Sequence, residues 1–398
     1  MLSTKENIFY IIDGYGLIFR SFFALPKLTT REGEPIGAVY GFFKTVIGLI
    51  NSSKPTHIAI ALDTGYKTFR NKLYDDFIEQ QNIKEIYNKY KMTFVLLGIE
   101  EDDIFNIDNK TLLSRLNINK EKCIKKCLEL NIINTISDNN EDIINKIPKS
   151  FILIYRIGLT DMIKVEKYKT QYKANRPECP KELVSQFKIV REFIDSINIR
   201  SESVYGFEAD DIIASLAYDC VKQNNQVVVV SGDKDLTQLV KNGKIGIFDP
   251  SKKQYLDEGG VLNKFGVRPD QIVDYLSIIG DRSDNVIGVN GIGPKGAIKL
   301  LKEYGNIENI YSNIDKLDIK TKEKFIEGKD WLTLARKLIK LRFDACKMNS
   351  IDDYKLNINH IGLAKFMDKY GFRDLETLNR KKELQNIAKN NITNKGLF

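Results

Sequence analysis

The chain has 398 residues, a formal net charge of +8, and 42% hydrophobic and 29% charged residues. These values are typical of a soluble globular protein with two or three subdomains, and no apolar stretch is long enough to span a bilayer. Five scattered cysteines argue against a disulfide framework, and the two histidines argue against a zinc hydrolase or a histidine-based triad. We therefore expect a cytoplasmic protein, and its basic balance favours a polyanionic partner.

Three short apolar runs each lead into an aspartate. Residues 8–12 precede Asp13, residues 57–62 precede Asp63, and residues 227–230 precede Ser-Gly-Asp233. Uninterrupted runs of this length predict strands buried on both faces of a parallel sheet, whose carboxyl ends form the functional crevice. Because crowded carboxylates repel one another, their convergence predicts a site for Mg²⁺ or Mn²⁺.

Two further acidic groups fit the same edge of the predicted sheet. One opens the helical pattern that begins at Glu208, and the other lies in the Gly-Asp-Arg-Ser-Asp-Asn segment 280–285. Helix capping alone would explain one or two acids in a first helical turn, and each acid alone would be an ordinary polar residue. Nine acids at such positions favour one site instead. They are Asp13, Asp63, Glu208, Asp210, Asp211, Asp233, Asp235, Asp281 and Asp284.

The order of the patterns predicts an α/β core that is interrupted once. A helix at 37–50 lies between the first two strands, and the pattern resumes after residue 170. The intervening segment is rich in Asn, Ile and Lys, with possible strands at 92–99 and 150–159. The predicted divisions are a first part of the core (1–75), an insertion (76–170), a second part of the core (171–272), a helical subdomain (273–320), and C-terminal helices with a polar tail (321–398).

A Gly-Ile-Gly turn at 291–293 stands between two helical segments. Such a turn exposes backbone N–H groups to a phosphate, and the next helix adds its dipole together with Lys295 and Lys299. It resembles the helix-hairpin-helix that holds duplex DNA by its backbone without reading sequence. The plain alternative is a glycine-rich connector between helices.

Together these segments resemble the 5′-nuclease, or flap endonuclease, family, in particular the N-terminal 5′–3′ exonuclease domain of bacterial DNA polymerase I. The matching segments occur in the family's order and are, with the hairpin, Ile12–Gly14, Ala61–Asp63, Lys67–Arg70, Tyr172–Pro177, Gly206–Asp211, Ser231–Asp235 and Gly280–Asn285.

The resemblance implies an α/β fold in which a mostly parallel sheet is flanked by helices. It places a helical arch within 171–272 and a DNA-binding helix-hairpin-helix subdomain at 273–320. It also implies two divalent ions. One lowers the pKa of a bound water, and the other stabilises the leaving oxygen. The first ion would be held by Asp13, Asp63, Glu208 and Asp210 with Asp211, and the second by Asp233, Asp235, Asp281 and Asp284. K⁺ is a candidate ion at the hairpin.

The resemblance assigns cations to the base of the arch. Arg70, Lys173 and Arg176 would contact the scissile phosphodiester, and Tyr172 would stack on a base near the 5′ end. In isolation each cation would be an exposed side chain in a weak surface pair. The residues implied to bind duplex DNA are Gly291, Gly293, Lys295 and Lys299.

The implied function is that of a monomeric 5′–3′ exonuclease and flap endonuclease acting on DNA with 5′ flaps, nicks or RNA primers. The sequence departs from the polymerase I domain in about 95 residues placed directly before the arch. The chain would be either a stand-alone nuclease or part of a split polymerase I, with a separate polymerase chain as partner. Two other classes stay open, a silent DNA-junction binder whose arch is blocked by the insertion and a PIN-type ribonuclease.

Overall fold

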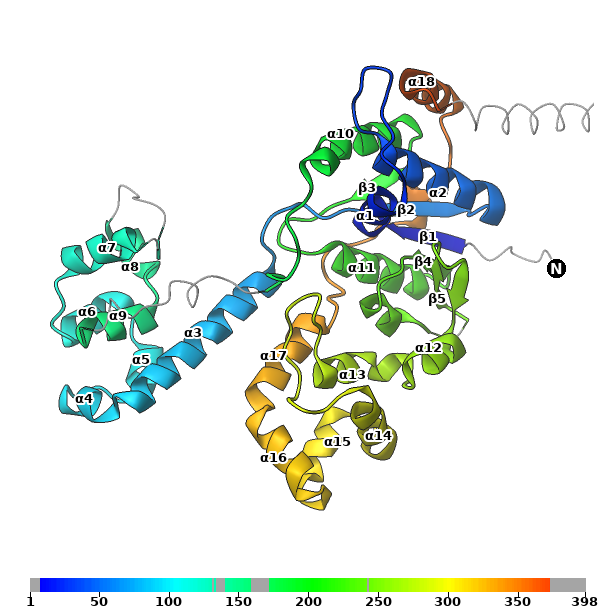
Figure 1. Cartoon of the computed structure of the whole chain (residues 1–398). Coiled ribbons are helices and arrows are strands. Elements are labelled where there is room, and N and C mark those ends of the chain that lie inside the picture. The colour runs from blue at the N-terminus through cyan, green and yellow to red at the C-terminus, as the bar shows by residue number, and fades with distance from the viewer. Residues whose placement is uncertain (1–7, 131, 134–139, 159–171, 242, 373–398) are drawn as a thin grey trace, which may run out of the picture.

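The computed structural model describes residues 8–130, 132–133, 140–158, 172–241 and 243–372 (Figure 1). One six-stranded sheet has the order β3-β2-β1-β4-β5-β6, in which β1 to β5 run parallel and β6 pairs antiparallel with β5. The predicted mostly parallel α/β sheet is therefore confirmed. Its strands are β1 (Ile8–Asp13), β2 (His57–Ala61), β3 (Arg200–Glu202), β4 (Gln226–Val230), β5 (Ile245–Asp249) and β6 (Gln254–Leu256).

Helices cover both faces of the sheet because successive strand residues point to opposite sides. Ile11 enters the apolar cluster on the side of α11 (Ala209–Lys222) and α13 (Ile272–Ile279). Ile12 enters the cluster of the opposite layer. The helices of that layer are α1 (Gly14–Ala24), α2 (Gly37–Ser53), α10 (Lys181–Ser196) and α18 (His360–Tyr370).

The strand order places a topological switch at the middle of the sheet. From β1 the chain adds β2 and β3 on one side, and it later adds β4 and β5 on the other. The crevice outside the carboxyl ends of β1 and β4 is where such sheets bind ligands. Asp13, the last residue of β1, and Ser231, the first residue after β4, both stand at this edge.

A helical subdomain follows the sheet. The Gly291–Gly293 turn leads into α14, and α13 packs against α14 and α17. The predicted glycine-rich turn thus lies between two helices, with the loop 280–290 preceding it. The helices of this subdomain are α12 (Glu258–Phe265), α13, α14 (Pro294–Tyr304), α15 (Ile307–Ser312), α16 (Ile319–Glu327) and α17 (Lys329–Ile339).

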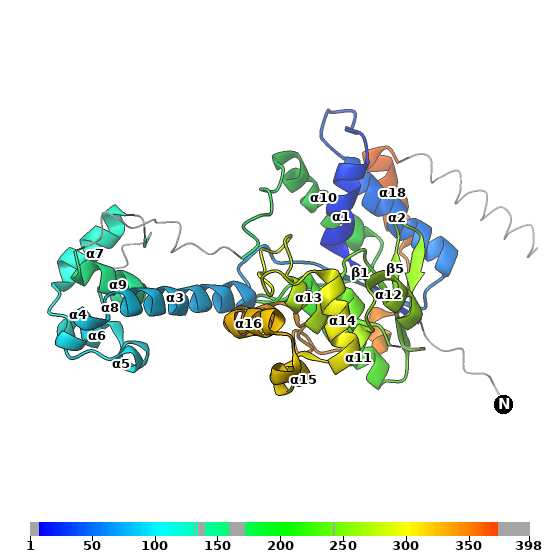
Figure 2. The same ribbon diagram turned by 60° about the horizontal axis from the view of Figure 1, so that its bottom comes forward.

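The segment predicted as an insertion forms a helical lobe with its own apolar cluster. Both views show α3 (Phe69–Lys89) projecting from the core and carrying the lobe at its far end (Figures 1 and 2). Neither α3 nor any other helix in the described ranges is long and apolar enough to cross a membrane. The lobe contains α4 (Lys91–Leu96), α5 (Glu101–Asn106), α6 (Asn109–Arg115), α7 (Lys120–Glu129), α8 (Asn140–Asn145) and α9 (Lys149–Arg156).

The two strands predicted within this segment were wrong, because residues 91–96 and 149–156 are helical. Short apolar runs fit a buried helix as well as a strand, and here they pack against other helices. The predicted division after residue 75 falls inside α3, whose Phe77 ring lies 4.8 Å from that of Trp331 on α17. The divisions after 272 and 320 likewise fall inside α13 and α16.

A substitution at Phe193 tests the packing of the apolar layer formed by α2, α10 and α18. Its ring is fully buried against Phe43 and Phe366, at centroid distances of 5.0 and 5.3 Å. We expect Phe193→Ala to lower the free energy of unfolding by about 3–5 kcal/mol, because it leaves a cavity in the core. Urea unfolding measures this loss.

The matched control is Phe23→Ala, because that ring is 67% exposed. We expect it to change the free energy of unfolding by less than about 0.5 kcal/mol. Equal effects of the two substitutions would contradict the described packing.

Candidate metal centre

Asp13 joins the carboxyl ends of the two central strands. Its Oδ1 accepts a hydrogen bond from the Gly16 backbone N–H at 2.8 Å, and its Oδ2 accepts one from Ser231 Oγ at 2.8 Å. Asp63 follows β2, and its Oδ1 accepts from the N–H of Ala209, the first residue of α11, at 2.8 Å. The strand-end acids are therefore fixed to the sheet edge and to the start of α11.

Asp210 adds a further carboxylate at the first turn of α11. Burial raises its pKa well above the usual value, and repulsion from Asp233 and Asp13 adds to the effect. Burial also raises the pKa of Asp13, to about 6, against the two hydrogen bonds that it accepts. Without a cation, this part of the site therefore favours bound protons.

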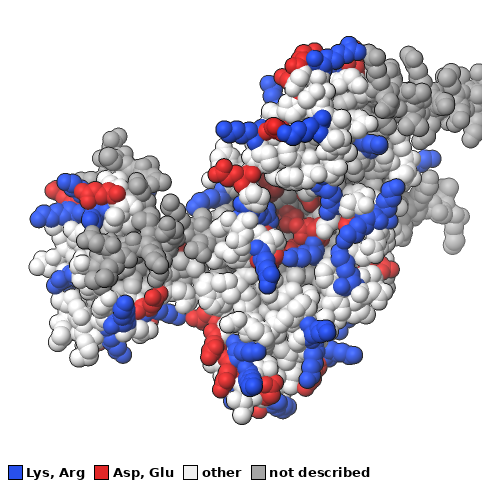
Figure 3. Space-filling view, in the orientation of Figure 1, with Lys and Arg blue, Asp and Glu red and all other residues white. Residues whose placement is uncertain are grey.

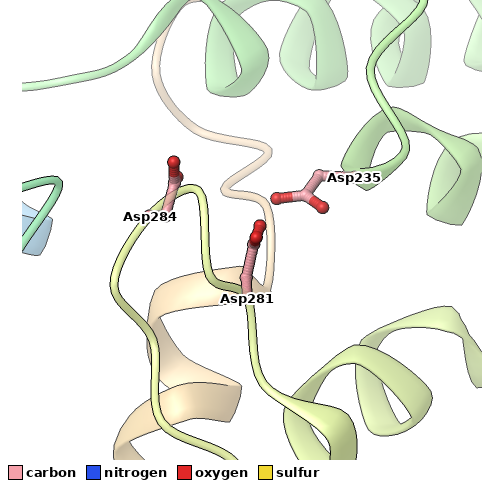
Figure 4. A group of neighbouring side chains, drawn as sticks. All are labelled: Asp235, Asp281 and Asp284. Atoms are coloured by element: carbon pink, nitrogen blue, oxygen red, sulfur yellow. The ribbon is translucent and has the colours of Figure 1, made fainter. Parts of the chain in front are cut away.

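Asp235, Asp281 and Asp284 form a second group, drawn in Figure 4, in which one oxygen of each lies within 4.8 Å of the others. Asp235 begins a short 3₁₀ helix after β4, and the other two belong to the loop that follows α13. Asp235 Oδ1 is buried without a hydrogen-bond partner. A buried carboxylate oxygen without a partner costs free energy, so the protein alone does not satisfy all the oxygens of this group.

Acids of both groups line one pocket, although Asp13 and Asp63 are not among its lining residues. Figure 3 shows acidic side chains in a hollow near the centre of the drawn face, with Lys and Arg side chains around it. The acids that line the pocket are Glu208, Asp210, Asp233, Asp235, Asp281 and Asp284, and Arg70, Tyr172 and Arg176 line it with them.

Cations from two segments neutralise part of this charge. Lys173 Nζ lies 2.7 Å from Glu208 and 3.8 Å from Asp284, so it bridges the two groups, and Arg176 pairs with Asp284 at 2.5 Å. Lys234 pairs with Asp281 at 2.8 Å.

These cations reach some acids and not others. Burial alone would raise the pKa of Glu208 and of Asp281, but Lys173 with Arg70 and Lys234 with Ser283 hold both values below the usual range. Burial and neighbouring acids raise the pKa of Asp235 well above the usual value. Hard oxygen donors that the protein leaves uncompensated are suitable ligands for Mg²⁺ or Mn²⁺.

Arg70 and Asp211 form a buried pair. The Arg70 guanidinium is buried and binds Asp211 through two hydrogen bonds of 2.5 and 2.8 Å, and its Nε donates to the Leu338 carbonyl at 2.7 Å. The Asp211 carboxylate is fully buried in this pair. Each side chain is therefore the partner of the other, and their expected contacts with a phosphate and a metal ion stay predictions.

The Tyr172 ring is also buried. Its side chain is 5% exposed, and its hydroxyl lies 3.5 Å from Glu208 Oε1. The ring is thus largely covered although it lines the acidic pocket, and its expected stacking on a base stays a prediction. Tyr172 packs beside Tyr74 of α3, at 6.2 Å between centroids, and contacts Glu208.

The hairpin lies beside the pocket in the helical subdomain. Lys295 and Lys299 are exposed on α14, and Gly291 has φ +74°. Lys324 Nζ of α16 donates to the Gly291 carbonyl at 3.0 Å. The Lys324 ammonium therefore engages one of the two lone pairs of this carbonyl, and K⁺ at the hairpin stays a prediction.

Three polar contacts of the site were not predicted. Ser231 and Lys234 stand among the acids of the 231–235 segment, so a local signal for them existed: a hydroxyl and a cation placed between carboxylates. Lys324 had no such signal, because it reaches the hairpin from 33 residues away.

Carboxylates gathered at the switch point of a parallel sheet are typical of metal-assisted phosphodiesterases, of which nucleases are one class. The family model described as "5′-3′ exonuclease, N-terminal resolvase-like domain" matches residues 8–111 and 107–266. The family model described as "5′-3′ exonuclease, C-terminal SAM fold" matches residues 267–360. The chain belongs to the 5′-3′ exonuclease family and is a nuclease, which confirms the predicted resemblance and reaction class.

Similar proteins agree with this membership. The chain is 29% identical over 378 residues to a 5′-3′ exonuclease of Aquifex aeolicus, covering 95% of both proteins. It is 29% identical over 349 residues to DNA polymerase I of Rhizobium leguminosarum, but spans only 25% of that protein. The T5 D15 protein, co-crystallised with metal ions, has a similar fold, with a TM-score of 0.50, 17% identity, and coverage of 92% of this chain and 98% of that one.

Neutralising the adjacent residues Asp210 and Asp211 should change the stability of the fold in different ways. Asp211→Asn should lower the free energy of unfolding by about 3–5 kcal/mol, because it leaves the buried Arg70 charge without its partner. Asp210→Asn should leave stability unchanged or increase it in EDTA, because it removes a carboxylate repelled by Asp233 and Asp13.

Denaturant unfolding in EDTA measures both variants. A large loss from Asp210→Asn, or none from Asp211→Asn, would contradict these assignments.

Proposed function

We propose that the chain is a divalent-metal-dependent 5′–3′ exonuclease and structure-specific flap endonuclease that acts on DNA. The observation that carries the proposal is the pocket lined by acids of both carboxylate groups. Lys173 bridges these groups, and Asp235 Oδ1 has no hydrogen-bond partner there. A basic surround and an acidic centre suit a polyanion whose phosphate is attacked at the metal site.

Each group would hold one ion. Asp13, Asp63, Glu208 and Asp210 would bind the first, and Asp233, Asp235, Asp281 and Asp284 the second, directly or through water. Bound divalent ions would supply an activated water and neutralise charge that builds on the phosphate. Lys173 and Arg176 would orient the phosphodiester, since both already reach acids of the pocket.

Arg70 would act by positioning rather than by contact. It lies 3.6 Å from Glu208 and holds Asp211 in the same helical turn as Asp210. A fixed first turn of α11 would keep two ligands of the first ion in place.

The hairpin would hold the duplex part of the substrate. Gly291, Gly293, Lys295 and Lys299 offer backbone and ammonium groups to phosphates, which positions DNA without reading its sequence. Lys324 and Lys299 line the same cavity of about 430 Å³ beside the turn. The proposed substrates are therefore duplexes with a 5′ flap, a nick or an RNA primer.

The position of the lobe supports an active enzyme rather than a catalytically silent DNA binder. Among the described residues of the insertion, none lines the acidic pocket, and the lobe stands at the far end of α3 (Figures 1 and 2). A PIN-type ribonuclease is less well supported, because the match to the exonuclease C-terminal fold covers residues 267–360.

Cleavage of a labelled 5′-flap duplex tests the proposal. The full-length chain should cut near the junction with Mg²⁺ and not with EDTA. Asp13→Asn and Asp210→Asn should each reduce the single-turnover rate by at least about 100-fold, because a direct ligand matters more than an outer contact worth about 10–100-fold.

Asp368→Asn is the matched control, since this acid lies exposed on α18 outside the pocket. It should cut as the unaltered chain does. Binding of the flap without cleavage in Mg²⁺ would refute the nuclease assignment, and preferred cutting of single-stranded RNA would favour a PIN-type enzyme.

Metal affinity should depend on pH. The pKa of Asp13 is raised to about 6 in the metal-free protein, chiefly by burial, and a bound ion requires the carboxylate form. The apparent Mg²⁺ affinity, measured by calorimetry, should therefore weaken as the pH falls from 7 to 5, with protons released on binding below about pH 6. An affinity independent of pH over this range would contradict the assignment of Asp13.

The same group has the opposite effect on stability without metal. Its folded pKa of about 6 exceeds the ordinary value of 3.8, so its contribution to stability is present below pH 3.8 and lost as the pH rises through 6. Mg²⁺ should restore stability above pH 6, because it binds the folded carboxylates.

A further inference from the structure

Two exposed tyrosines pack against each other on loops that also carry acids of the metal centre. The ring centroids of Tyr66 and Tyr205 lie 5.4 Å apart at an interplanar angle of 55°. Their exposed fractions are 67% and 73%, although large aromatic side chains usually bury most of their surface. Neither ring contributes to the core, so the pair needs a different explanation.

Each tyrosine is close to a proposed metal ligand along the chain. Tyr66 follows Asp63 by three residues, and Tyr205 precedes Glu208 by three. Three residues span at most about 11 Å, so the pair lies at the edge of the site whatever the path of the loops.

Backbone hydrogen bonds tie the two loops together on both sides of the pair. The Leu62 N–H donates to the Glu202 carbonyl at 2.8 Å, and the Phe69 N–H donates to the Gly206 carbonyl at 3.0 Å. The rings are therefore held on a joined framework, which reduces the entropy lost when a ligand binds.

The surroundings of the pair suit a nucleic acid strand. Lys67 follows Tyr66 directly, and its side chain is 70% exposed, with Asp75 at 3.6 Å as a loose partner. Sites for single-stranded nucleic acid combine aromatic rings, on which bases stack, with positive charges that bind the phosphate backbone. Tyr172, for which stacking was expected, is 5% exposed, so Tyr66 and Tyr205 offer far more aromatic surface than it does.

We propose that Tyr66 and Tyr205 form a stacking platform for an unpaired nucleobase in the single-stranded 5′ end of the substrate. The platform rests on the proposed nuclease function and extends it to the recognition of the flap. Because every base offers an aromatic face, the platform would favour unpaired DNA without favouring a sequence.

Binding measured in EDTA, where no cleavage occurs, tests the platform. The probes are a fluorescent 5′-flap duplex and a series in which one flap nucleotide at a time is abasic. Tyr66→Ala and Tyr205→Ala should each weaken binding of the normal flap about tenfold. Tyr66→Phe and Tyr205→Phe should bind like the unaltered chain, since the rings remain.

The abasic series separates stacking from other effects. For the unaltered chain, removal of one particular base should weaken binding by a similar factor. The alanine variants should be insensitive to that removal, because the interaction is already lost. Their melting temperatures should be unchanged, since both side chains are exposed.

Tyr218→Ala is the matched control. Tyr218 pairs with Phe343 at 5.5 Å and 55°, and it is 45% exposed. It lies ten residues beyond Glu208 on α11, about 15 Å along the helix. This variant should bind and cut flaps like the unaltered chain.

The outcomes distinguish the platform from the nuclease. Failure of the unaltered chain to cut flaps in Mg²⁺ would overturn the proposed function, whereas the binding series would still decide the platform. Alanine variants that bind and cut normally would overturn the platform and leave the pair to a protein partner. Equal losses on normal and abasic flaps would also overturn it, because stacking requires the base.

Discussion

The buried ion pair between Arg70 and Asp211 joins three separate parts of the molecule. Arg70 belongs to α3, and Asp211 belongs to α11. The last turn of α17 and the segment that follows it close the pair through the Leu338 carbonyl and the Arg342 N–H. A buried charge without its partner costs several kcal/mol, so none of the three parts can shift independently. The acidic turn of α11, the base of the lobe and the helical subdomain are thereby held in one geometry.

That fixed geometry explains how the fold tolerates so many carboxylates. The protein supplies its own cations to Glu208 and Asp281 and lowers their pKa, but it leaves Asp210 and Asp235 with raised pKa values. A flexible loop would relieve such repulsion by moving apart. Here the strands and the capped helix prevent that movement, so the protein alone does not relieve the repulsion between these carboxylates.

The sheet and the acidic edge could be predicted because strand-end acids are local patterns. The distinction between Asp210 and Asp211 could not, since adjacent helical residues point about 100° apart and the choice depends on Arg70, 141 residues away. The burial of Tyr172 depends on distant packing in the same way. The strands expected in the insertion failed because short apolar runs carry no preference until their neighbours are known.

The long helix α3 gives the molecule a mechanical property. Its 21 residues form a rod of about 30 Å, with the lobe at one end and Arg70 at the other. A tilt of about 10° at the base would displace the lobe by about 5 Å over such a length. Because the Arg70–Asp211 pair and the packing of Phe77 on Trp331 fix the base of this rod, such a tilt would require a change at the ion pair beside Glu208.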